Sequence, residues 1–225
     1  MQDKAYISIR SLLFLMGLLY AGGAFAQEDS NEVQEVNNEF QTRTEVKLSF
    51  EPLKGLSLSL NPEIRWDESF SVSKYMLESG ISYKPLKGLS LGGSYRFIIN
   101  PRETKSTEYL NRFAVYTSYK KKIERFEPSL RIKYTNYTED LTKGEFLRYR
   151  AKLEYNIKGK KITPQVGAEA FHYLEENLIY KMRYSIGAEY KINKNSSIGL
   201  GYMLDYYLTE YQNKHIIKIG YKYKF

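Results

Sequence analysis

The residues of this chain that could do chemistry are charged side chains that recur at every second position. Between Arg148 and Glu154 the alternate positions hold Arg, Arg, Lys and Glu, and similar runs occur along most of the sequence. Rings of charged side chains select ions in pores, and a ring richer in Arg and Lys than in carboxylates favours anions. The spacing therefore predicts a charged lining that attracts anions.

This alternating set defines the candidate site, and it holds thirteen basic residues against seven acidic ones. Its basic members are Arg43, Lys47, Arg65, Arg96, Arg112, Arg131, Lys133, Arg148, Arg150, Lys152, Lys181, Arg183 and Lys218. Its acidic members are Glu45, Glu63, Glu78, Glu154, Glu169, Glu189 and Asp205.

Charge pairing is the alternative role for the same residues. Neighbouring strands place side chains about 5 Å apart, so opposite charges on adjacent strands can pair into ladders that fill and stiffen an interior. The excess of basic residues then either forms an anion-selective constriction or belongs to a structural lumen that is filled by paired side chains. The alternation leaves both readings open.

The two histidines, His172 and His215, are the only candidates for general base chemistry in the chain. Both fall near strand ends, where an enzyme could act on lipid, but neither has a recognisable nucleophile close by in the sequence. No GxSxG, HExxH, phosphate-binding loop or acidic calcium loop is present. We therefore expect no cofactor, no metal and no enzymatic activity, with a lipid-modifying enzyme at the rim as the alternative.

The elements that carry these side chains are β-strands, because apolar and polar residues alternate with a period of two. From Tyr180 to Tyr190 every second residue is Tyr, Met, Ile or Ala, and the residues between them are polar or Gly. The same alternation predicts eleven strands, at about 40–50, 56–66, 72–83, 89–99, 108–119, 126–137, 145–156, 162–173, 179–190, 196–207 and 215–225.

The connections between the predicted strands include a repeat. The heptapeptide PLKGLSL occurs at Pro52–Leu58 and again at Pro85–Leu91, 33 residues later. Pro and Gly favour tight turns, so each copy is interpreted as a hairpin turn that leads into the next strand. The repeating unit is one hairpin with its loop.

Two architectures could hold these strands. A soluble barrel buries its apolar face, whereas a membrane barrel turns that face to lipid and its charged face to the lumen. Strands of ten to twelve residues, tyrosines near strand ends and short turns that alternate with longer loops favour the second. Tyr221, Tyr223 and the terminal Phe225 are typical of the signal that the outer-membrane barrel assembly machinery binds.

The N-terminus predicts export. Lys4 and Arg10 precede the apolar run Ser11–Gly23, and Ala24 to Ala26 form a small-residue cleavage site, so residues 1–26 are interpreted as a signal peptide cleaved after Ala26. The chain contains no cysteine, which excludes disulfides and thiolate ligands. The expected location is the cell outer membrane.

Strand number is the open question for the barrel, which is assigned to residues 39–225. Bacterial single-chain barrels have an even number of strands, and eleven segments are apparent. Residues 27–38 form a periplasmic segment or a weak first strand, in which Asn31–Asn37 would make a twelfth strand or run through the lumen as a tether. The predicted fold is an all-β, up-and-down antiparallel transmembrane barrel of about twelve strands, with ten as the alternative.

Paired hairpins with Glu63 and Arg65 in NPEIRW, the related run Ser94–Phe97 and the repeated turn give a resemblance to a known family. Over most of residues 38–225 the chain resembles the small Gram-negative outer-membrane barrels called domain of unknown function number twenty-four ninety. The resemblance implies the fold and the location, and it implies no activity and no catalytic residues.

The predicted function is that of a monomeric outer-membrane barrel, either a small anion-preferring pore or a structural envelope protein with a charge-filled lumen. The formal net charge is +8, but its carriers are expected to face the lumen or lipid headgroups and no nucleic-acid motif occurs. The expected partners are outer-membrane lipid, the phosphates of lipopolysaccharide and the assembly machinery, and no nucleic acid.

Overall fold

The computed structural model describes residues 36–102, 106–136 and 144–225, and its regular elements are all β-strands. Within these ranges no helix is long and apolar enough to cross a membrane. The predicted signal peptide and residues 27–35 lie outside the described residues. The strands are β1 (Asn37–Leu53), β2 (Leu56–Trp66), β3 (Val72–Leu86), β4 (Leu89–Asn100), β5 (Glu108–Lys120), β6 (Phe126–Thr135), β7 (Phe146–Tyr155), β8 (Ile162–Tyr173), β9 (Leu178–Lys191), β10 (Ser196–Tyr207) and β11 (Gln212–Lys224).

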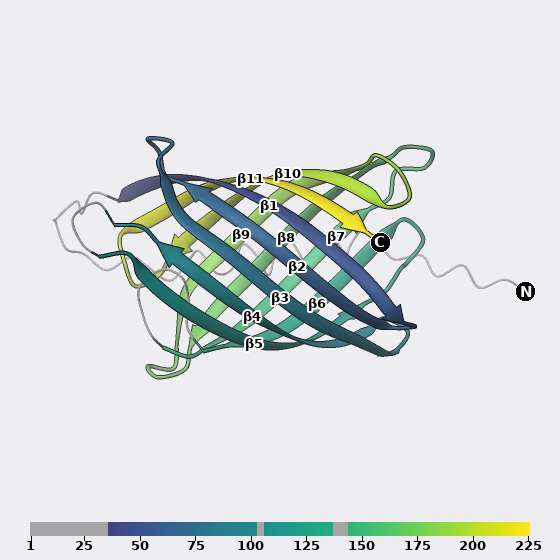
Figure 1. Cartoon of the computed structure of the whole chain (residues 1–225), viewed down its shortest axis with the longest axis horizontal. Coiled ribbons are helices and arrows are strands. Elements are labelled where there is room, and N and C mark those ends of the chain that lie inside the picture. Colours follow the sequence, from purple (N-terminus) through teal and green to yellow (C-terminus); the bar gives the residue numbers. More distant parts are fainter. Residues whose placement is uncertain (1–35, 103–105, 137–143) are drawn as a thin grey trace, which may run out of the picture. The chain divides into compact units, whose positions relative to one another are not determined.

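The strands close into a barrel in which each pairs with its neighbours in sequence (Figure 1). Ten contacts between neighbours are antiparallel, and β1 pairs with β11 in parallel. The pairing runs from Asn37 opposite Gln212 to Ser49 opposite Lys224. The barrel therefore has eleven strands, between the ten and twelve predicted, and no described residue supplies a twelfth. An odd number of alternating strands leaves the first and last pointing the same way, which is why the closing pair is parallel.

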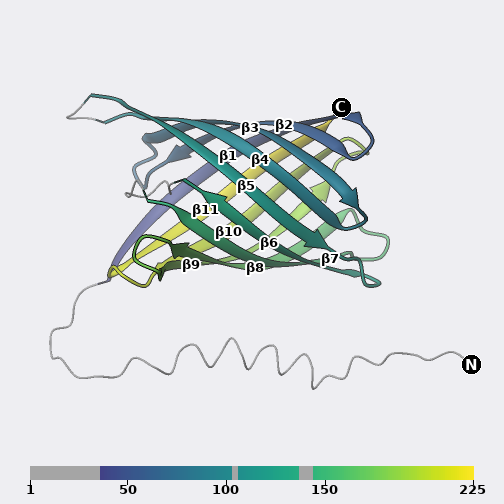
Figure 2. The ribbon, with the colours of Figure 1, turned by 90° about the horizontal axis from the view of Figure 1, so that it is seen from below.

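The connections divide the barrel into two ends. The turn end carries the β1–β2, β3–β4, β5–β6, β7–β8 and β9–β10 connections together with Phe225, and the loop end carries the others. Figure 2 shows the C-terminus at the same end as the β1–β2 hairpin. Because β1 is parallel to β11, its first residue, Asn37, lies at the loop end.

The repeated heptapeptide forms two equivalent turns, as predicted. Gly55 and Gly88 adopt φ angles of 83° and 87°, which a residue with a Cβ adopts only at a cost. Each glycine carbonyl accepts a hydrogen bond from a lysine N–H of the next hairpin, Gly55 from Lys84 and Gly88 from Lys120, both at 2.9 Å. The 33-residue spacing thus repeats one turn and one contact between adjacent hairpins.

The two faces of the barrel wall differ in chemistry as the alternation predicts. The outward positions are apolar and exposed, and they include Leu58, Ile81, Leu91, Val115, Leu130, Val166, Ile186, Leu200 and Ile217. The inward positions carry most of the buried charges, including Arg43, Arg65, Arg112, Lys133, Glu169, Lys181 and Asp205. This distribution is the reverse of a soluble barrel, whose interior is apolar.

Tyr180 breaks the predicted alternation of apolar outward and polar inward side chains. Tyr180 was assigned by period to the outward apolar face, and this assignment is wrong, because the side chain is buried within the interior. The β8–β9 register shifts between Phe171 and His172, whose partners are Lys181 and Ile179, so Tyr180 is an extra residue on β9. A β-bulge of this kind points two successive side chains the same way, here those of Tyr180 and Lys181.

The parallel closure predicts a specific cross-link. Thr42 on β1 lies opposite Ile217 on β11, at the Cα separation of about 5 Å typical of paired strands, within the range that a disulfide bridges. Since the chain has no cysteine of its own, Thr42→Cys with Ile217→Cys should oxidise to a disulfide that changes mobility on a non-reducing gel.

The matched control keeps Ile217→Cys and moves the other cysteine to Val46, whose partner in the register is Tyr221. Val46 lies four residues, about 13 Å along the strand, from the residue that faces Ile217. This cysteine pair should therefore stay reduced. Cross-linking of the control alone would contradict the parallel register and with it the eleven-strand closure.

Candidate functional site

The lumen contains an apolar layer at its loop end. Phe146, Phe171, Tyr180 and Tyr207, at the loop-side ends of β7 to β10, form one buried cluster. Met76 and Ile98 form a second on β3 and β4, with Leu110 of β5 packed against it. Phe146 packs against Tyr173 with ring centroids 5.0 Å apart, and Tyr180 meets Tyr207 edge to face at 5.5 Å. The term apolar layer denotes these two clusters below.

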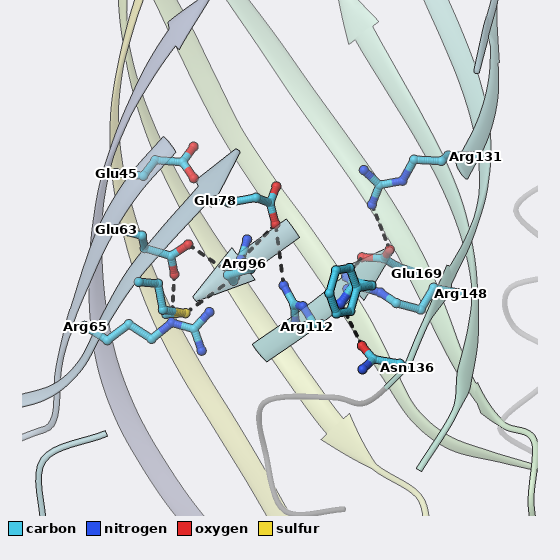
Figure 3. A network of polar contacts seen from close by, with 12 residues as sticks. Glu45, Glu63, Arg65, Glu78, Arg96, Arg112, Arg131, Asn136, Arg148 and Glu169 are labelled. Carbon is cyan, nitrogen blue, oxygen red and sulfur yellow. Dashed lines mark hydrogen bonds and ion pairs between the residues drawn. The ribbon is translucent and has the colours of Figure 1, made fainter. Parts of the chain in front are cut away.

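Towards the turn end the apolar layer gives way to a tier of charged side chains. On β2 to β5, Arg65 Nε lies 2.7 Å from Glu63, and Arg96 lies 2.8 Å from Glu78 and 3.7 Å from Glu63. Arg112 reaches Glu78 at 3.7 Å. Figure 3 shows Glu78 between the two guanidinium groups of Arg96 and Arg112. The charges therefore form a connected network rather than isolated pairs.

Across the lumen, Glu169 of β8 forms ion pairs with two arginines. Its carboxylate oxygens lie 3.0 Å from Arg131 and 3.1 Å from Arg148 (Figure 3). The Arg148 guanidinium also stands 4.3 Å from the centre of the Phe171 ring, which links the charged tier to the apolar layer. A cation above an aromatic face is attracted by the ring quadrupole, and more strongly where water is excluded.

The most deeply buried ion pair involves Asp205 of β10, whose side chain has no exposed surface. It accepts hydrogen bonds from Arg183 at 2.5 and 2.6 Å and from Lys181 at 3.1 Å. Lys181 is 1% exposed and also lies 4.8 Å from the ring centres of Phe171 and Tyr207. The carboxylate thus holds two cations at the boundary between the two layers.

The strand register places like charges opposite one another. Arg131 faces Arg150, and Lys133 faces Arg148, on β6 and β7. Like charges directly opposite destabilise a sheet. Within the described ranges neither Lys133 nor Arg150 forms an ion pair or a side-chain hydrogen bond. Rungs of opposite charge, as predicted, occur on β3–β4 and from β7 to β10. On β1–β2, β4–β5 and β6–β7 the register instead places like charges opposite each other.

A cavity of about 230 Å³ lies within the charged tier. Its lining contains ten Arg and Lys side chains and four Glu side chains. A second cavity of about 210 Å³ adjoins it towards the turn end and shares Glu45, Arg150, Ser185 and Lys218 with it. The inward positions of this second cavity include Gly167, Gly199, Gly201 and Gly220, which contribute no side chain to fill it.

Exposure of the charged groups increases towards the turn end. Lys218 and Lys222 are 35% and 46% exposed, whereas Arg112 deeper in the lumen is 3% exposed. Lys47, Lys191, Lys222 and Lys224 line a mouth of about 730 Å³ at this end. The described inward side chains therefore change from buried apolar rings near the loop end to exposed lysines at the turn end.

The structure places every predicted network residue on the lumen side, but in different settings. Most of them lie in the buried tier. The turn-end half contains the other four, Lys47, Lys152, Glu154 and Glu189. There Lys152 pairs with Glu154 at 2.7 Å, and Glu189 pairs with Lys222. The apolar layer was not predicted. Strict alternation could have located Phe146, Phe171 and Tyr207, each two positions from a predicted charge, but not the bulged Tyr180.

The histidines lie on the outer face near the loop end. His172 hydrogen-bonds to Asn177 at 3.0 Å, and His215 contacts the Tyr202 hydroxyl at 2.6 Å and Asn38 at 3.2 Å. Among the described residues neither ring contacts a serine or a carboxylate, so the part of the chain in view holds no nucleophile with an oriented base. No group of three or more potential metal ligands occurs there either.

The terminal residues predicted as an assembly signal lie at the turn end. Tyr223 and Phe225 pack edge to face at 4.9 Å, and the Phe225 N–H donates to the Ser49 carbonyl at 2.9 Å. Tyr221 is an outward, partly exposed residue. Their recognition by the assembly machinery stays a prediction.

Comparison with known families gives one match. Residues 40–215 match the model of the family described as protein of unknown function (DUF2490). The chain belongs to this family. The match spans β1 to the start of β11, so it covers nearly the whole barrel, including the charged tier. A search of curated proteins finds no match.

The burial of Asp205 predicts a large stability effect. Asp205→Asn leaves Lys181 and Arg183 buried without their shared carboxylate, and breaking a buried ion pair costs about 3–5 kcal/mol. Urea unfolding of the refolded barrel, followed by tryptophan fluorescence, should show this loss. The control is Glu51→Gln, which removes the exposed pair between Glu51 and Lys224, and it should leave the unfolding midpoint nearly unchanged. Equal effects of the two variants would contradict the central position of Asp205.

Proposed function

We propose that the chain is an exported, outer-membrane-spanning barrel with a structural role in the envelope, whose lumen is closed to free diffusion. The outer surface supports the membrane setting. Its middle carries exposed aliphatic side chains, and aromatic residues gather towards both ends. Tyr83, Tyr119, Phe126 and Tyr190 lie near the turn end, and Phe40, Tyr75, Tyr109 and Tyr206 near the loop end. Aromatic girdles of this kind flank the apolar band of membrane barrels.

Strand length supports the same proposal. The shortest strands, β6 and β7, have ten residues, and a tilted strand of about 9–11 residues spans a bilayer. The expected partners are outer-membrane lipid, lipopolysaccharide and the barrel assembly machinery. By analogy with other outer-membrane barrels, the turn end faces the periplasm and the loop end faces outward.

The observation that carries the structural role is the filled loop end of the lumen. Barrels of eight strands are filled by side chains and those of sixteen or more leave an aqueous channel, so eleven strands permit either outcome. Here Phe146, Phe171, Ile98 and Ile216 are almost completely buried on the inward face. The charged tier beneath them is connected by ion pairs. A structural barrel is therefore favoured over a diffusion pore.

The second candidate is a small anion-preferring pore. The observation in its favour is the excess of cations around the inner cavity. If the barrel conducts, reversing the charge of Arg65, Arg96, Arg131, Arg148, Arg150 or Arg183 should shift the reversal potential.

Planar-bilayer recording separates the two candidates. The mature protein should be silent, and Phe146→Ala combined with Phe171→Ala should produce anion-selective steps, because it removes two rings of the apolar layer. Phe113→Ala, which shortens an outward ring, is the control and should remain silent. Steady steps from the unchanged protein would reject the closed lumen and establish the pore. Silence of the double variant would show that the apolar layer is not the block.

Single cysteines test the membrane location and orientation. Glu176→Cys, in the β8–β9 connection, should react with a membrane-impermeant maleimide in intact cells, because it is exposed at the loop end. Lys160→Cys, in the β7–β8 connection, is equally exposed but should react only after the outer membrane is permeabilised. The opposite pattern would invert the proposed orientation, and labelling of neither site in purified outer membranes would reject the location.

A further inference from the structure

Two neighbouring rungs on the inward face of β6 and β7 consist of four cations, and a single carboxylate of β8 forms ion pairs with two of them. Arg131 faces Arg150, and Lys133 faces Arg148, in two successive rungs of the β6–β7 ladder. Glu169 of the next strand contacts Arg131 and Arg148. This set of four cations is called the β6–β7 cluster below.

A purely structural filling does not account for the β6–β7 cluster. Facing rungs of opposite charge stabilise a sheet, as Glu78 and Arg96 do on β3 and β4, and Arg150 faces Glu169 of β8 in this way. On the β6–β7 side both rungs of the cluster oppose like charges, which destabilise a sheet. The Nε atoms of Arg131 and Arg148 are buried and have no hydrogen-bond partner among the described residues. Lys133 is only 7% exposed. A buried donor without a hydrogen bond costs free energy, so a bound acceptor would stabilise this arrangement.

The space beside the β6–β7 cluster sets the size of that acceptor. The cavity of about 230 Å³ is smaller than the roughly 300–1,000 Å³ of sites for drug-sized ligands. It is lined by all four members of the cluster. A compact oxyanion with several acceptor oxygens fits this volume and satisfies several donors together, whereas a nucleotide or an oligosaccharide does not.

We propose that the β6–β7 cluster is a binding site for a small multivalent oxyanion of the phosphate type, reached from the turn end of the barrel. At neutral pH a phosphate group carries close to two negative charges and strong acceptor oxygens. The path is the adjoining cavity, which shares Arg150 with the site and has Gly199 and Gly220 in its wall. This site goes beyond the structural role proposed above and requires the closed barrel alone, so it is testable in detergent without a membrane.

Isothermal titration calorimetry of the refolded mature protein in neutral detergent, with inorganic phosphate as the probe, tests the site. Arg150→Gln should weaken phosphate binding at least about tenfold, the factor that corresponds to about 1.4 kcal/mol. Arg150 forms no ion pair with any described residue, so its removal leaves no carboxylate unpaired. Lys158→Gln, at an exposed turn position, is the control and should bind phosphate as the unchanged protein does.

The same variants distinguish binding from a structural role. In phosphate-free buffer Arg150→Gln should unfold at nearly the same urea concentration as the unchanged protein, because it removes both the like-charge rung with Arg131 and the opposite-charge rung with Glu169, which keeps its ion pairs with Arg131 and Arg148. Phosphate should raise the unfolding midpoint of the unchanged protein and of Lys158→Gln, and not that of Arg150→Gln. Absence of a phosphate effect in the unchanged protein, or an equal effect in all three proteins, would overturn the proposal. So would a marked destabilisation by Arg150→Gln.

A blocking variant tests the route and the source of the phosphate. A Cβ atom at Gly199 would lie 3.7 Å from its nearest neighbour, the Ala188 carbonyl oxygen, and the backbone there is not in the left-handed region. Gly199→Phe should therefore fold, with its ring in the adjoining cavity. It should lose phosphate binding although every cation is intact. The second source is the phosphate of a lipid headgroup. To test it, the unfolding midpoint is compared in phosphatidylglycerol and phosphatidylcholine vesicles, without free phosphate. A higher midpoint in phosphatidylglycerol that persists in Gly199→Phe would assign the phosphate to lipid and reject the lumen site.

Discussion

The parallel pairing of β1 with β11 is the contact on which the rest of the structure depends. It satisfies the backbone groups of the two strands that would otherwise be open edges, along thirteen residue pairs from Asn37 to Ser49. It also brings Arg43 and Glu45 of β1 next to Lys218 of β11, where Lys218 and Glu45 lie 2.8 Å apart. Without closure the charged faces of the strands would have no common interior, and neither the buried tier nor its cavity would exist.

Closure in turn determines the electrostatics of the lumen. Arg65, Lys181 and Asp205 are nearly inaccessible to water, so each must find a partner within the wall. Arg65 pairs with Glu63, and Lys181 pairs with Asp205. Glu78 and Glu169 pair with other buried arginines of the tier. Like charges also face each other on β1–β2 and β4–β5, but the β6–β7 cluster places two like-charge rungs of cations in succession, and Lys133 and Arg150 in it form no ion pair with a described residue. The lumen thus contains a stabilising network of ion pairs and one cluster of cations that repel each other. Electrostatically unfavourable clusters concentrate at functional sites.

The two ends of the lumen have different chemistry for a simple geometric reason. Inward positions near the loop end carry Phe146, Phe171 and Tyr207, whose rings meet across neighbouring strands, whereas inward positions near the turn end carry Gly167, Gly199 and Gly220. The same backbone cylinder is therefore filled at one end and hollow at the other. The basic residues of the interior are therefore most exposed at the turn end, the end from which the proposed ligand would enter.

Period-two alternation in the sequence by itself determined the strand segments and the chemistry of the two faces, because a strand turns successive side chains to opposite sides. It did not determine the number of strands in the barrel, which is eleven and not the predicted twelve or ten. The same alternation predicts that the charged set from Arg43 to Lys218 shares one face of the wall. Only the tertiary structure decided how the ends meet, since the parallel β1–β11 register depends on contacts between residues more than 170 positions apart. It alone revealed the bulge that turns Tyr180 inward, because one inserted residue leaves no mark on a local pattern. It also decided which charges pair: the register sets Glu78 against Arg96 but Arg131 against Arg150, and register follows from turn geometry and closure rather than from the composition of either strand.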